Sequence, residues 1–390
     1  MTNPLAPNWL TEPSDVNAID ARVWPDGTVR RESGELEFAG VPASELAAQF
    51  GTPLYVIDEE TFRARAKEAK AVAERVAAEV GTTAKVYYAS KAFLSTEIVS
   101  WIQEDGLNID VASGGEFAAA IAGGMPAARI GLHGNNKSLR EIGRAVTAGV
   151  GAIVVDSEIE IERIASAAGA QDKIQPVRLR INTGVHANTH DFLATAREDQ
   201  KFGIALSDVP DLVAKIRSHS NLRFLGLHSH IGSQIFVVDG FVAAAERLLD
   251  VHAELLKTGD VPELNLGGGF GISYTTADRP MPIAEMAERI CAAVAAKCKA
   301  LGIPVPKLAF EPGRTIAGPA GVTLYTVGTI KDVVVSDQGA GAVRKYVSVD
   351  GGMSDNARPA LYEAEYSASI ASRTSNATAA LARVVGKHCE

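Results

Sequence analysis

Cysteine is scarce in this chain of 390 residues, which contains only Cys291, Cys298 and Cys389. An odd number without the short pair spacing of zinc sites excludes a disulfide framework and a cysteine-rich metal centre. Cys291 and Cys298 lie in an Ala-rich stretch with a helical pattern. We therefore expect both of them to fill a core.

Long apolar runs are also missing. No stretch approaches the roughly 18 to 20 apolar residues that a membrane-spanning helix needs, and the start of the chain lacks the basic head and apolar segment of an export signal. Basic residues do not predominate either, since 38 Lys and Arg stand against 47 Asp and Glu, a formal net charge of -9. Such a chain has no overall positive field for a polyanion. We expect a cytoplasmic protein without a nucleic-acid or membrane partner.

The chain does contain a repeating pattern of strands and helices. From about residue 85, a short apolar strand, a polar or glycine-rich corner and an amphipathic helix follow one another, which is typical of parallel sheets. Eight such units predict a (β/α)8 TIM barrel, although a doubly wound open sheet would give a similar local pattern. The predicted strands are residues 85–90, 107–113, 129–134, 152–157, 177–182, 224–232, 263–269 and 307–313.

Both ends of the chain differ from this pattern. Residues 22–40 read as a turn-linked pair of strands, and residues 321–350 alternate apolar and polar side chains with many β-branched ones. We expect the two ends to form one β domain, with an N-terminal part in residues 1–58 and a C-terminal part in 321–390. The barrel would then occupy residues 59–320.

A lysine follows the first predicted strand. The C-terminal ends of barrel strands meet at one face, so residues far apart in sequence share one pocket. Lys91 would face the barrel mouth in a partly desolvated place, and burial favours the neutral amine that forms Schiff bases. A surface lysine at the start of a helix is the alternative.

Two further motifs end later strands. Three consecutive glycines, Gly267 to Gly269, would let backbone N–H groups approach a phosphate, although a simple glycine turn explains them equally well. The sequence EPGR at residues 311–314 offers a carboxylate for a ring nitrogen and a guanidinium for a phosphate or carboxylate. A strand-end salt bridge is the alternative.

Histidine and arginine motifs elsewhere are weaker signals. In HSHIGSQ, residues 228–234, two histidines share a strand face before a compact corner that suits an anion, with core histidines as the alternative. His186 and His190 have the spacing of helical metal ligands, but neighbouring Gly and Asn argue against a helix and a third ligand is missing, so we expect no metal. Arg358 and Tyr362 share a predicted helix face and could together hold a carboxylate, with a capped surface helix as the alternative.

Taken together, these motifs resemble a known family. The lysine after the first strand, the glycine triplet after the seventh and EPGR after the eighth resemble fold-type III pyridoxal-phosphate enzymes, the alanine-racemase-like barrels with a C-terminal β domain. Within that group, the chain resembles the diaminopimelate decarboxylases in YYASKAF, HGNNKS, HSHIGSQI, LGGGFGI, EPGR, SVDGGMSDNARPALY and GKHCE.

The resemblance implies pyridoxal 5'-phosphate as the cofactor. Lys91 would hold it covalently, Glu311 would face the pyridine nitrogen and His230 would stack on the ring. The implied cofactor contacts are Lys91, Asp110, His230, Ser233, Gly267, Gly268, Gly269, Glu311, Pro312, Gly313 and Arg314.

The resemblance also implies a reaction, the decarboxylation of meso-2,6-diaminopimelate to L-lysine and CO2 as the last step of lysine biosynthesis. The enzyme would be a homodimer with its active site at the interface. Lys91, His230 and Cys389 would be catalytic, with Cys389 of one subunit protonating the carbanion in the other. The implied substrate contacts are Arg314, Arg358, Tyr362 and Glu390.

Other interpretations remain open. A fold-type III decarboxylase of ornithine, arginine or carboxynorspermidine is one, although these substrates lack the D-configured distal carboxylate that Arg358 and Tyr362 would bind. A non-catalytic pyridoxal-phosphate protein would keep Lys91 without needing the terminal cysteine, and a phosphosugar barrel enzyme would explain the glycines alone. Family members continue beyond the Cys-Glu pair, so we also expect a chain ending at Glu390 to be weakly active or inactive.

Overall fold

The computed structural model describes residues 3–7, 10, 12–185, 201–335 and 342–389. The chain divides into two compact units. The barrel unit comprises residues 63–272 and 279–318, and the β unit comprises residues 1–62, 273–278 and 319–390.

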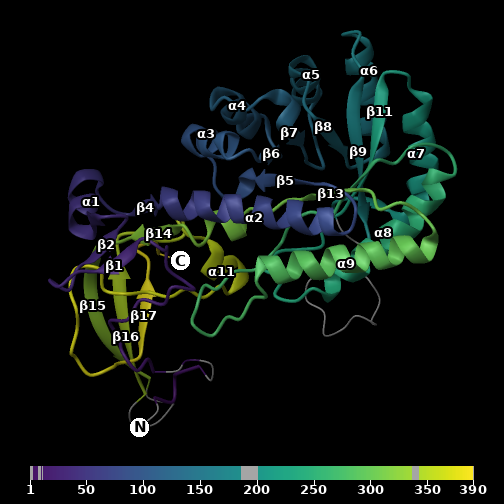
Figure 1. The fold of residues 1–390 in the computed structure, drawn as a ribbon. Helices are drawn as coiled ribbons and strands as arrows, with labels where there is room; N and C mark the ends of the chain where they lie inside the picture. Colours follow the sequence, from purple (N-terminus) through teal and green to yellow (C-terminus); the bar gives the residue numbers. More distant parts are fainter. Residues whose placement is uncertain (1–2, 8–9, 11, 186–200, 336–341, 390) are drawn as a thin grey trace. The chain divides into compact units, whose positions relative to one another are not determined.

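The barrel unit contains eight parallel strands that close into a ring (Figure 1). Hydrogen bonds join β9, β11, β12, β13, β5, β6, β7 and β8 in that order, and β8 pairs with β9 to complete the ring. The short strand β10 (Ile204–Ala205) also pairs with β9. The closed ring confirms the predicted (β/α)8 barrel and excludes an open sheet. The barrel strands are β5 (Ala84–Ala89), β6 (Asn108–Val111), β7 (Ile130–Leu132), β8 (Ala152–Val155), β9 (Gln175–Asn182), β11 (Leu222–His228), β12 (Glu263–Asn265) and β13 (Lys307–Phe310).

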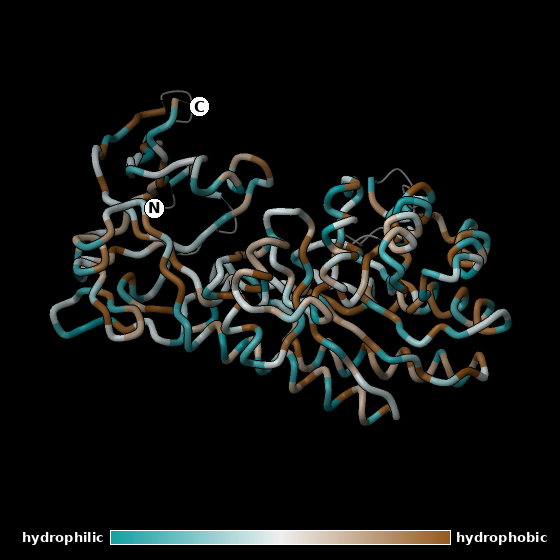
Figure 2. Tube along the Cα trace, turned by 90° about the horizontal axis from the view of Figure 1, so that it is seen from above, coloured by the Kyte–Doolittle hydropathy of each residue, from teal (hydrophilic) through white to brown (hydrophobic). Residues whose placement is uncertain are grey.

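The barrel strands are apolar because they are covered on both sides. Figure 2 shows that brown, hydrophobic stretches alternate with teal, hydrophilic ones along the chain. Every residue of β7 and β8 is buried. A charged exception is Arg178 in β9, which donates to Glu263 Oε2 at 2.7 Å and to the hydroxyl of Tyr87 at 2.9 Å. Since Glu263 is the first residue of β12, this cluster lies at the N-terminal end of the barrel.

Helices follow the strands and bury one face each. In α5, Ser138 and Glu141 form a capping box, Ile142 and Val146 are buried, and Gly149 ends the helix in the left-handed conformation. The helices are α2 (Glu59–Glu79), α3 (Thr96–Glu104), α4 (Gly114–Ala122), α5 (Leu139–Ala148), α6 (Glu158–Gly169), α7 (Val209–Ser218), α8 (Asp239–Leu256), α9 (Ile283–Leu301) and the short α10 (Arg314–Ala317).

The β unit combines both ends of the chain, as predicted. Strand β4 (Leu54–Ile57) pairs antiparallel with β14 (Gly321–Leu324), and the amide of Leu36 donates to the carbonyl of Ala371 at 2.7 Å. A small core forms around Leu36, Phe38, Ala43 and Leu324. The other elements are β1 (Thr28–Arg30), β2 (Leu36–Phe38), β3 (Val41–Pro42), α1 (Ala43–Phe50), β15 (Val327–Val334), β16 (Val343–Val349), α11 (Arg358–Tyr362) and β17 (Ala382–Val385).

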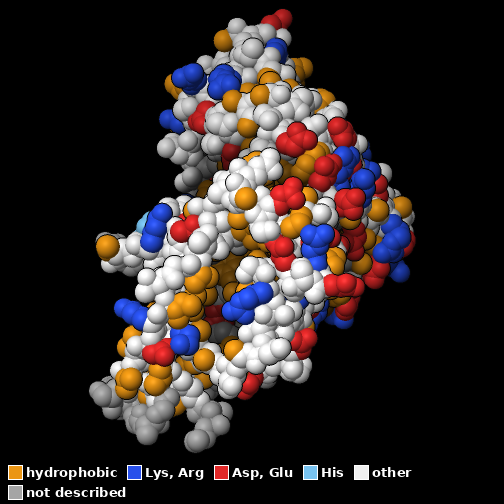
Figure 3. All heavy atoms as spheres, turned by 90° about the vertical axis from the view of Figure 1, so that its left-hand side faces the viewer, with side chains coloured by type: hydrophobic (Ala, Val, Ile, Leu, Met, Phe, Trp, Pro, Cys, Tyr) orange, Lys and Arg blue, Asp and Glu red, His pale blue; other side chains and the backbone are white. Residues whose placement is uncertain are grey.

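The distribution of charged side chains and the burial of two cysteines agree with what the composition predicts. Figure 3 shows acidic and basic side chains interspersed over one face, without a large patch of a single sign. Among the described residues, no helix has the length and apolar character needed to cross a membrane. Cys291 and Cys298 are buried in α9, as expected for core residues, whereas Cys389 is exposed.

Candidate active site

The C-terminal ends of the barrel strands carry the predicted cofactor residues. Lys91 lies in the short 3-10 helix η1 (Ser90–Ala92) directly after β5, Asp110 lies in β6, and Glu311 directly follows β13. His230 and the glycine triplet follow β11 and β12. Because all these strands are parallel, their ends share one rim of the barrel.

Lys91 is exposed, which corrects the expectation of a partly desolvated position. The buried run from Val86 to Ser90 ends one residue earlier, where the chain leaves strand geometry and enters η1. The Lys91 ammonium still acts on the site. Burial is the largest cause that lowers the pKa of His230, and the charge of Lys91 is the second largest. The same charge opposes the rise in the pKa of Asp110.

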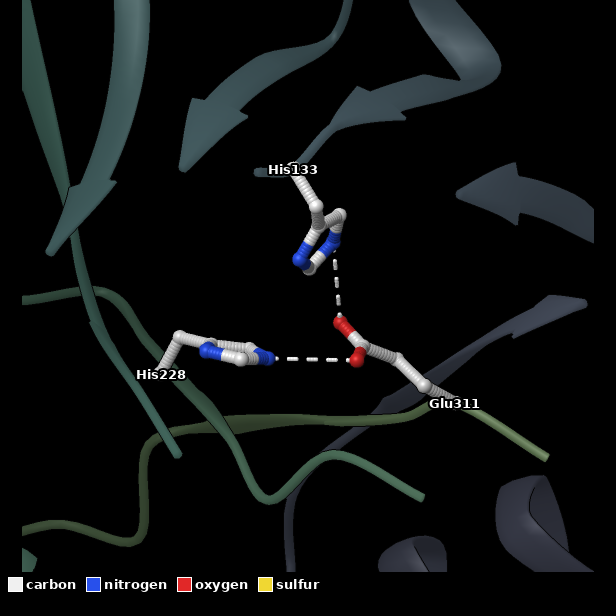
Figure 4. A group of neighbouring side chains, drawn as sticks. All are labelled: His133, His228 and Glu311. Carbon is white, nitrogen blue, oxygen red and sulfur yellow. Dashed lines mark hydrogen bonds and ion pairs between the residues drawn. The ribbon is translucent and has the colours of Figure 1, made fainter. Parts of the chain in front are cut away.

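The carboxylate of Glu311 is the centre of a buried hydrogen-bonded cluster (Figure 4). Nε2 of His133 lies 3.3 Å from Oε1, and Nε2 of His228 lies 3.1 Å from Oε2. The amide of Asn265 donates to Oε1 at 2.7 Å. Sequence reasoning proposed Glu311 but missed both histidine partners, since the pattern indicated only that they end strands.

Electrostatics assign different charge states to these groups. Burial alone would raise the pKa of Glu311, but His228 and His133 outweigh it and hold this pKa well below its usual range. Burial lowers the pKa of His228 to about 4 and also lowers that of His133, so both imidazoles are neutral at pH 7. Burial and the charge of Glu311 raise the pKa of Asp110 well above its usual range. This arrangement favours an ionised Glu311 and makes the carboxyl group of Asp110 take up a proton more readily than a free one.

The same cluster has the composition of a metal site. One ligand atom from each of His133, His228 and Glu311 lies within 4.8 Å of the others. However, each histidine Nε2 faces its own carboxylate oxygen, and Asn265 also donates to the carboxylate. We therefore interpret the cluster as a hydrogen-bonded carboxylate. The two histidines considered earlier, His186 and His190, lie outside the described residues.

The glycine triplet joins three strand-end loops. A Cβ on Gly268 would lie 1.9 Å from the carbonyl oxygen of Glu311, and one on Gly269, where φ is +110°, would lie 2.3 Å from that of Gly232. The amide of Gly268 also donates to Nδ1 of His230 at 3.3 Å. Only glycine fits between these backbones, so close packing accounts for the triplet and fixes His230 beside it.

Ser233 and Arg314 form a polar corner next to the triplet. An amino group of Arg314 donates to the hydroxyl of Ser233 at 2.9 Å. Within the described part of the chain, the amides of Gly232, Ser233 and Gly269 donate no hydrogen bond. These amides and the guanidinium are suitable donors for an anion such as a phosphate.

The turn at residues 311–314 packs against the end of β5. The carbonyl of Pro312 accepts a hydrogen bond from the amide of Ala89 at 3.1 Å. A Cβ on Gly313 would lie 2.8 Å from Cβ of Ala89, so the approach is close. Ala89 precedes Lys91 by two residues, and the turn therefore lies beside the predicted cofactor lysine.

Arg180 is a site residue that sequence reasoning missed. It lies near the C-terminal end of β9, with Nε 3.8 Å from Oδ1 of Asp156 and its guanidinium 4.3 Å from the ring centre of Phe202. Its charge helps to lower the pKa values of the three site histidines. The signal was the strand VRLRIN, where two arginines occupy one face of an otherwise apolar strand.

Arg358 and Tyr362 belong to the β unit and lie on α11, in the predicted helix. Nε of Arg358 donates to the hydroxyl of Tyr366 at 2.9 Å, and its guanidinium lies 5.5 and 5.6 Å from the ring centres of Tyr274 and Tyr362. In the described ranges, its terminal nitrogens make no hydrogen bond or ion pair. Sequence reasoning missed Tyr274, which lies on a distant segment, and Tyr366, which follows Arg358 by eight residues beyond the end of α11.

Cys389 also belongs to the β unit. The preceding residue, His388, has Nε2 3.0 Å from the hydroxyl of Ser354. The chain end therefore packs on the loop that leads into α11. Glu390 lies outside the described residues.

The barrel unit matches a family profile described as "Pyridoxal-dependent decarboxylase, pyridoxal binding domain" over residues 66–318. This match covers all eight strands of the ring. Together with the closed barrel, it defines the class of the protein as a pyridoxal-dependent decarboxylase.

Relatives narrow the class. A diaminopimelate decarboxylase of Mycobacterium leprae is 50% identical over 392 residues, covering 98% of this chain and 81% of the relative. That of Corynebacterium efficiens is 46% identical over 380 residues, covering 96% and 80%. The crystal structure of diaminopimelate decarboxylase from M. jannaschii in complex with L-lysine superposes with a TM-score of 0.85 at 30% identity, covering 94% and 82%. The chain belongs to the diaminopimelate decarboxylase family.

Proposed function

We propose that the protein decarboxylates meso-2,6-diaminopimelate to L-lysine and CO2 with pyridoxal 5'-phosphate as its cofactor. The observation that carries this proposal is the buried Glu311 carboxylate, which His133, His228 and Asn265 keep ionised. An ionised carboxylate at the strand ends can retain a proton on a pyridine nitrogen. The family membership supports the same reaction.

The residues of the barrel unit fit the cofactor at three points. Lys91, exposed at the end of β5, supplies an amine for the aldehyde group. Glu311 supplies the partner of the ring nitrogen. The corner of Ser233, Arg314 and the unpaired amides supplies donors for the phosphate.

When bound, pyridoxal phosphate supplies an electron sink for the electron pair that departing CO2 leaves behind. The ionised carboxylate of Glu311 would accept a hydrogen bond from the ring N–H and so keep the proton on the ring nitrogen. Burial is the main cause that lowers the pKa of His230 to about 3, so this neutral imidazole would add no positive charge beside the ring. Lys91 would hold the cofactor through its amine.

The β unit would recognise the second amino-acid head of the substrate. The terminal nitrogens of Arg358 have no partner in the described ranges, so the guanidinium can bind a carboxylate with two parallel hydrogen bonds. Tyr362 would complete this carboxylate site, and Glu390 would bind the distal ammonium. Cys389 would donate the proton that replaces the lost carboxylate.

The substrate is tested by measuring CO2 release. Purified protein loaded with pyridoxal phosphate is given meso-diaminopimelate, ornithine, arginine or carboxynorspermidine, with Lys91→Ala as the inactive control. We expect release from meso-diaminopimelate alone, with L-lysine as the product. Faster release from another amine would overturn the proposed substrate, and bound cofactor without any release would indicate a non-catalytic protein.

We also propose that the active enzyme is a homodimer in which one subunit contributes Cys389 to the site that holds Lys91 of the other. Mixing the inactive variants Lys91→Ala and Cys389→Ala under subunit exchange should then restore roughly a quarter of wild-type activity, because half of the dimers would contain one intact site. Each variant exchanged with itself is the control. No recovery from the mixture, with exchange verified by mass, would place both residues in one subunit.

A further inference from the structure

We propose that His133 and His228 are positioning residues that hold Glu311 ionised and aimed at the cofactor ring nitrogen. This inference rests on the proposed function, because it assigns a purpose to the hydrogen bonds around Glu311. Neither histidine is among the residues expected to touch the cofactor.

The two histidines approach the carboxylate from separate strands. His133 directly follows β7 and His228 ends β11, and each directs Nε2 at a different oxygen of Glu311 (Figure 4). Their rings meet edge to face with centres 5.0 Å apart. This contact restricts both rings, so the carboxylate is held in one orientation.

The other nitrogen of His228 shows that its contact with Glu311 is the purpose of this side chain. Nδ1 of His228 is buried and has no hydrogen-bond partner among the described residues. An unpaired buried nitrogen costs free energy, so an apolar residue would suit a purely structural position better. The single polar contact that offsets this cost is the one with Glu311.

The donors leave room for the cofactor. A carboxylate has about four lone-pair sites; His228 and Asn265 each occupy one through a hydrogen bond, and Nε2 of His133 lies 3.3 Å from Oε1. The remaining site can accept a ring N–H. Arg180 also interacts electrostatically with Glu311 and Asp110. Burial and the charge of Glu311 raise the pKa of Asp110, a rise that the Lys91 charge opposes.

The test removes the donor and then restores it. His133→Leu and His228→Leu, singly and together, keep apolar volume but lose the N–H group, whereas His133→Gln and His228→Gln carry an amide donor of similar reach. His252→Gln is the matched control, because His252 is another buried histidine of the barrel unit with a pKa lowered to about 4, and it does not contact Glu311.

Two measurements report on Glu311 independently of turnover. The first is the dissociation constant of pyridoxal phosphate, and the second is the 15N chemical shift of the ring nitrogen in labelled cofactor. We expect the Leu variants to bind the cofactor roughly 10- to 100-fold more weakly for each donor lost, with a shift towards the unprotonated ring nitrogen. The Gln variants should stay within about threefold of wild type, as should His252→Gln.

Two results would overturn the proposal. One is wild-type affinity and chemical shift in the double Leu variant, and the other is an equal loss in Leu and Gln variants, which would show a packing role only. If the Leu variants fail to fold, the cofactor-free wild type provides the test: 15N spectra at pH 7 must show His133 and His228 neutral with the proton on Nε2. Failure of the wild type to bind pyridoxal phosphate would instead refute the proposed function.

Discussion

The substitution Gly268→Ala tests how closely the strand-end loops must pack. An added Cβ would lie 1.9 Å from the carbonyl oxygen of Glu311, whereas real Cβ contacts are essentially never shorter than 3.0 Å. The Cβ is fixed to the backbone of residue 268 and the oxygen belongs to the backbone of Glu311, so no side-chain rotation can relieve the clash. The two loops must separate by about 1 Å, and Glu311 and the Gly268 contact with His230 must move with them.

The expected consequence is large for function. A misplacement of about 1 Å costs on the order of 100-fold in rate when it affects groups that position reacting atoms. We expect Gly268→Ala to lower kcat/KM for decarboxylation by roughly that factor and to weaken cofactor binding, while the far-ultraviolet circular dichroism of the barrel is retained.

A matched glycine provides the control. Gly143 lies in α5, and a Cβ there meets no atom within 4 Å. Gly143→Ala should therefore leave kcat/KM and cofactor binding unchanged and stabilise the protein by about 0.4 to 1 kcal/mol. Wild-type cofactor affinity and kcat/KM in Gly268→Ala would refute the argument that this glycine sets the position of Glu311.

The remaining predictions concern single groups. Lys91→Ala should abolish the visible absorbance of the protein–cofactor Schiff base and all turnover, and borohydride labelling of any other lysine in wild type would contradict this. Cys389→Ala should keep the cofactor and slow decarboxylation roughly 10²- to 10⁴-fold in a steady-state assay, so full activity would remove this thiol from the mechanism. Treatment with EDTA should not change activity, whereas a loss restored by zinc would assign a metal to the histidine–glutamate cluster. Burial lowers the pKa of His252 to about 4, so the unfolded chain binds a proton first and stability falls as the pH drops from 6.5 towards 4. In urea unfolding, the free energy of unfolding of His252→Leu should therefore fall by about 2 to 3 kcal/mol less than that of the wild type over this pH range. An unchanged pH dependence would be the contrary result.

The fold could be predicted because local patterns determine it. Parallel strands buried on both faces are short apolar runs, so the strand predicted at residues 152–157 corresponds to β8, Ala152–Val155. Local sequence also indicates where helices begin, as the capping box of Ser138 and Glu141 does for α5. The exposure of Lys91 could not be predicted, because it depends on where η1 turns away from the strand.

The site could be predicted only from the rule that the C-terminal ends of parallel barrel strands share one rim. That rule placed Lys91 and Glu311 on one face of the barrel, and their roles towards the cofactor stay predictions. It could not indicate that His133 and His228 meet the carboxylate of Glu311, because such contacts depend on barrel register and ring orientation. Among the tyrosines around Arg358, Tyr362 follows the helical spacing and could be predicted, whereas Tyr274 comes from a segment far away in sequence, so spacing carried no signal for it.

The charge state of Glu311 could not be predicted from its own motif, residues 311–314, alone. A buried carboxylate normally takes up a proton, because the interior stabilises an ion less well than water does. Glu311 remains ionised since donors from three other strand ends, His133, His228 and Asn265, reach its two oxygens. These donors are assembled by barrel closure, which brings β7, β11 and β12 around the end of β13. The barrel therefore determines the chemistry of this carboxylate as well as its position, and a change that alters strand register should change the pKa of Glu311 before it unfolds the protein.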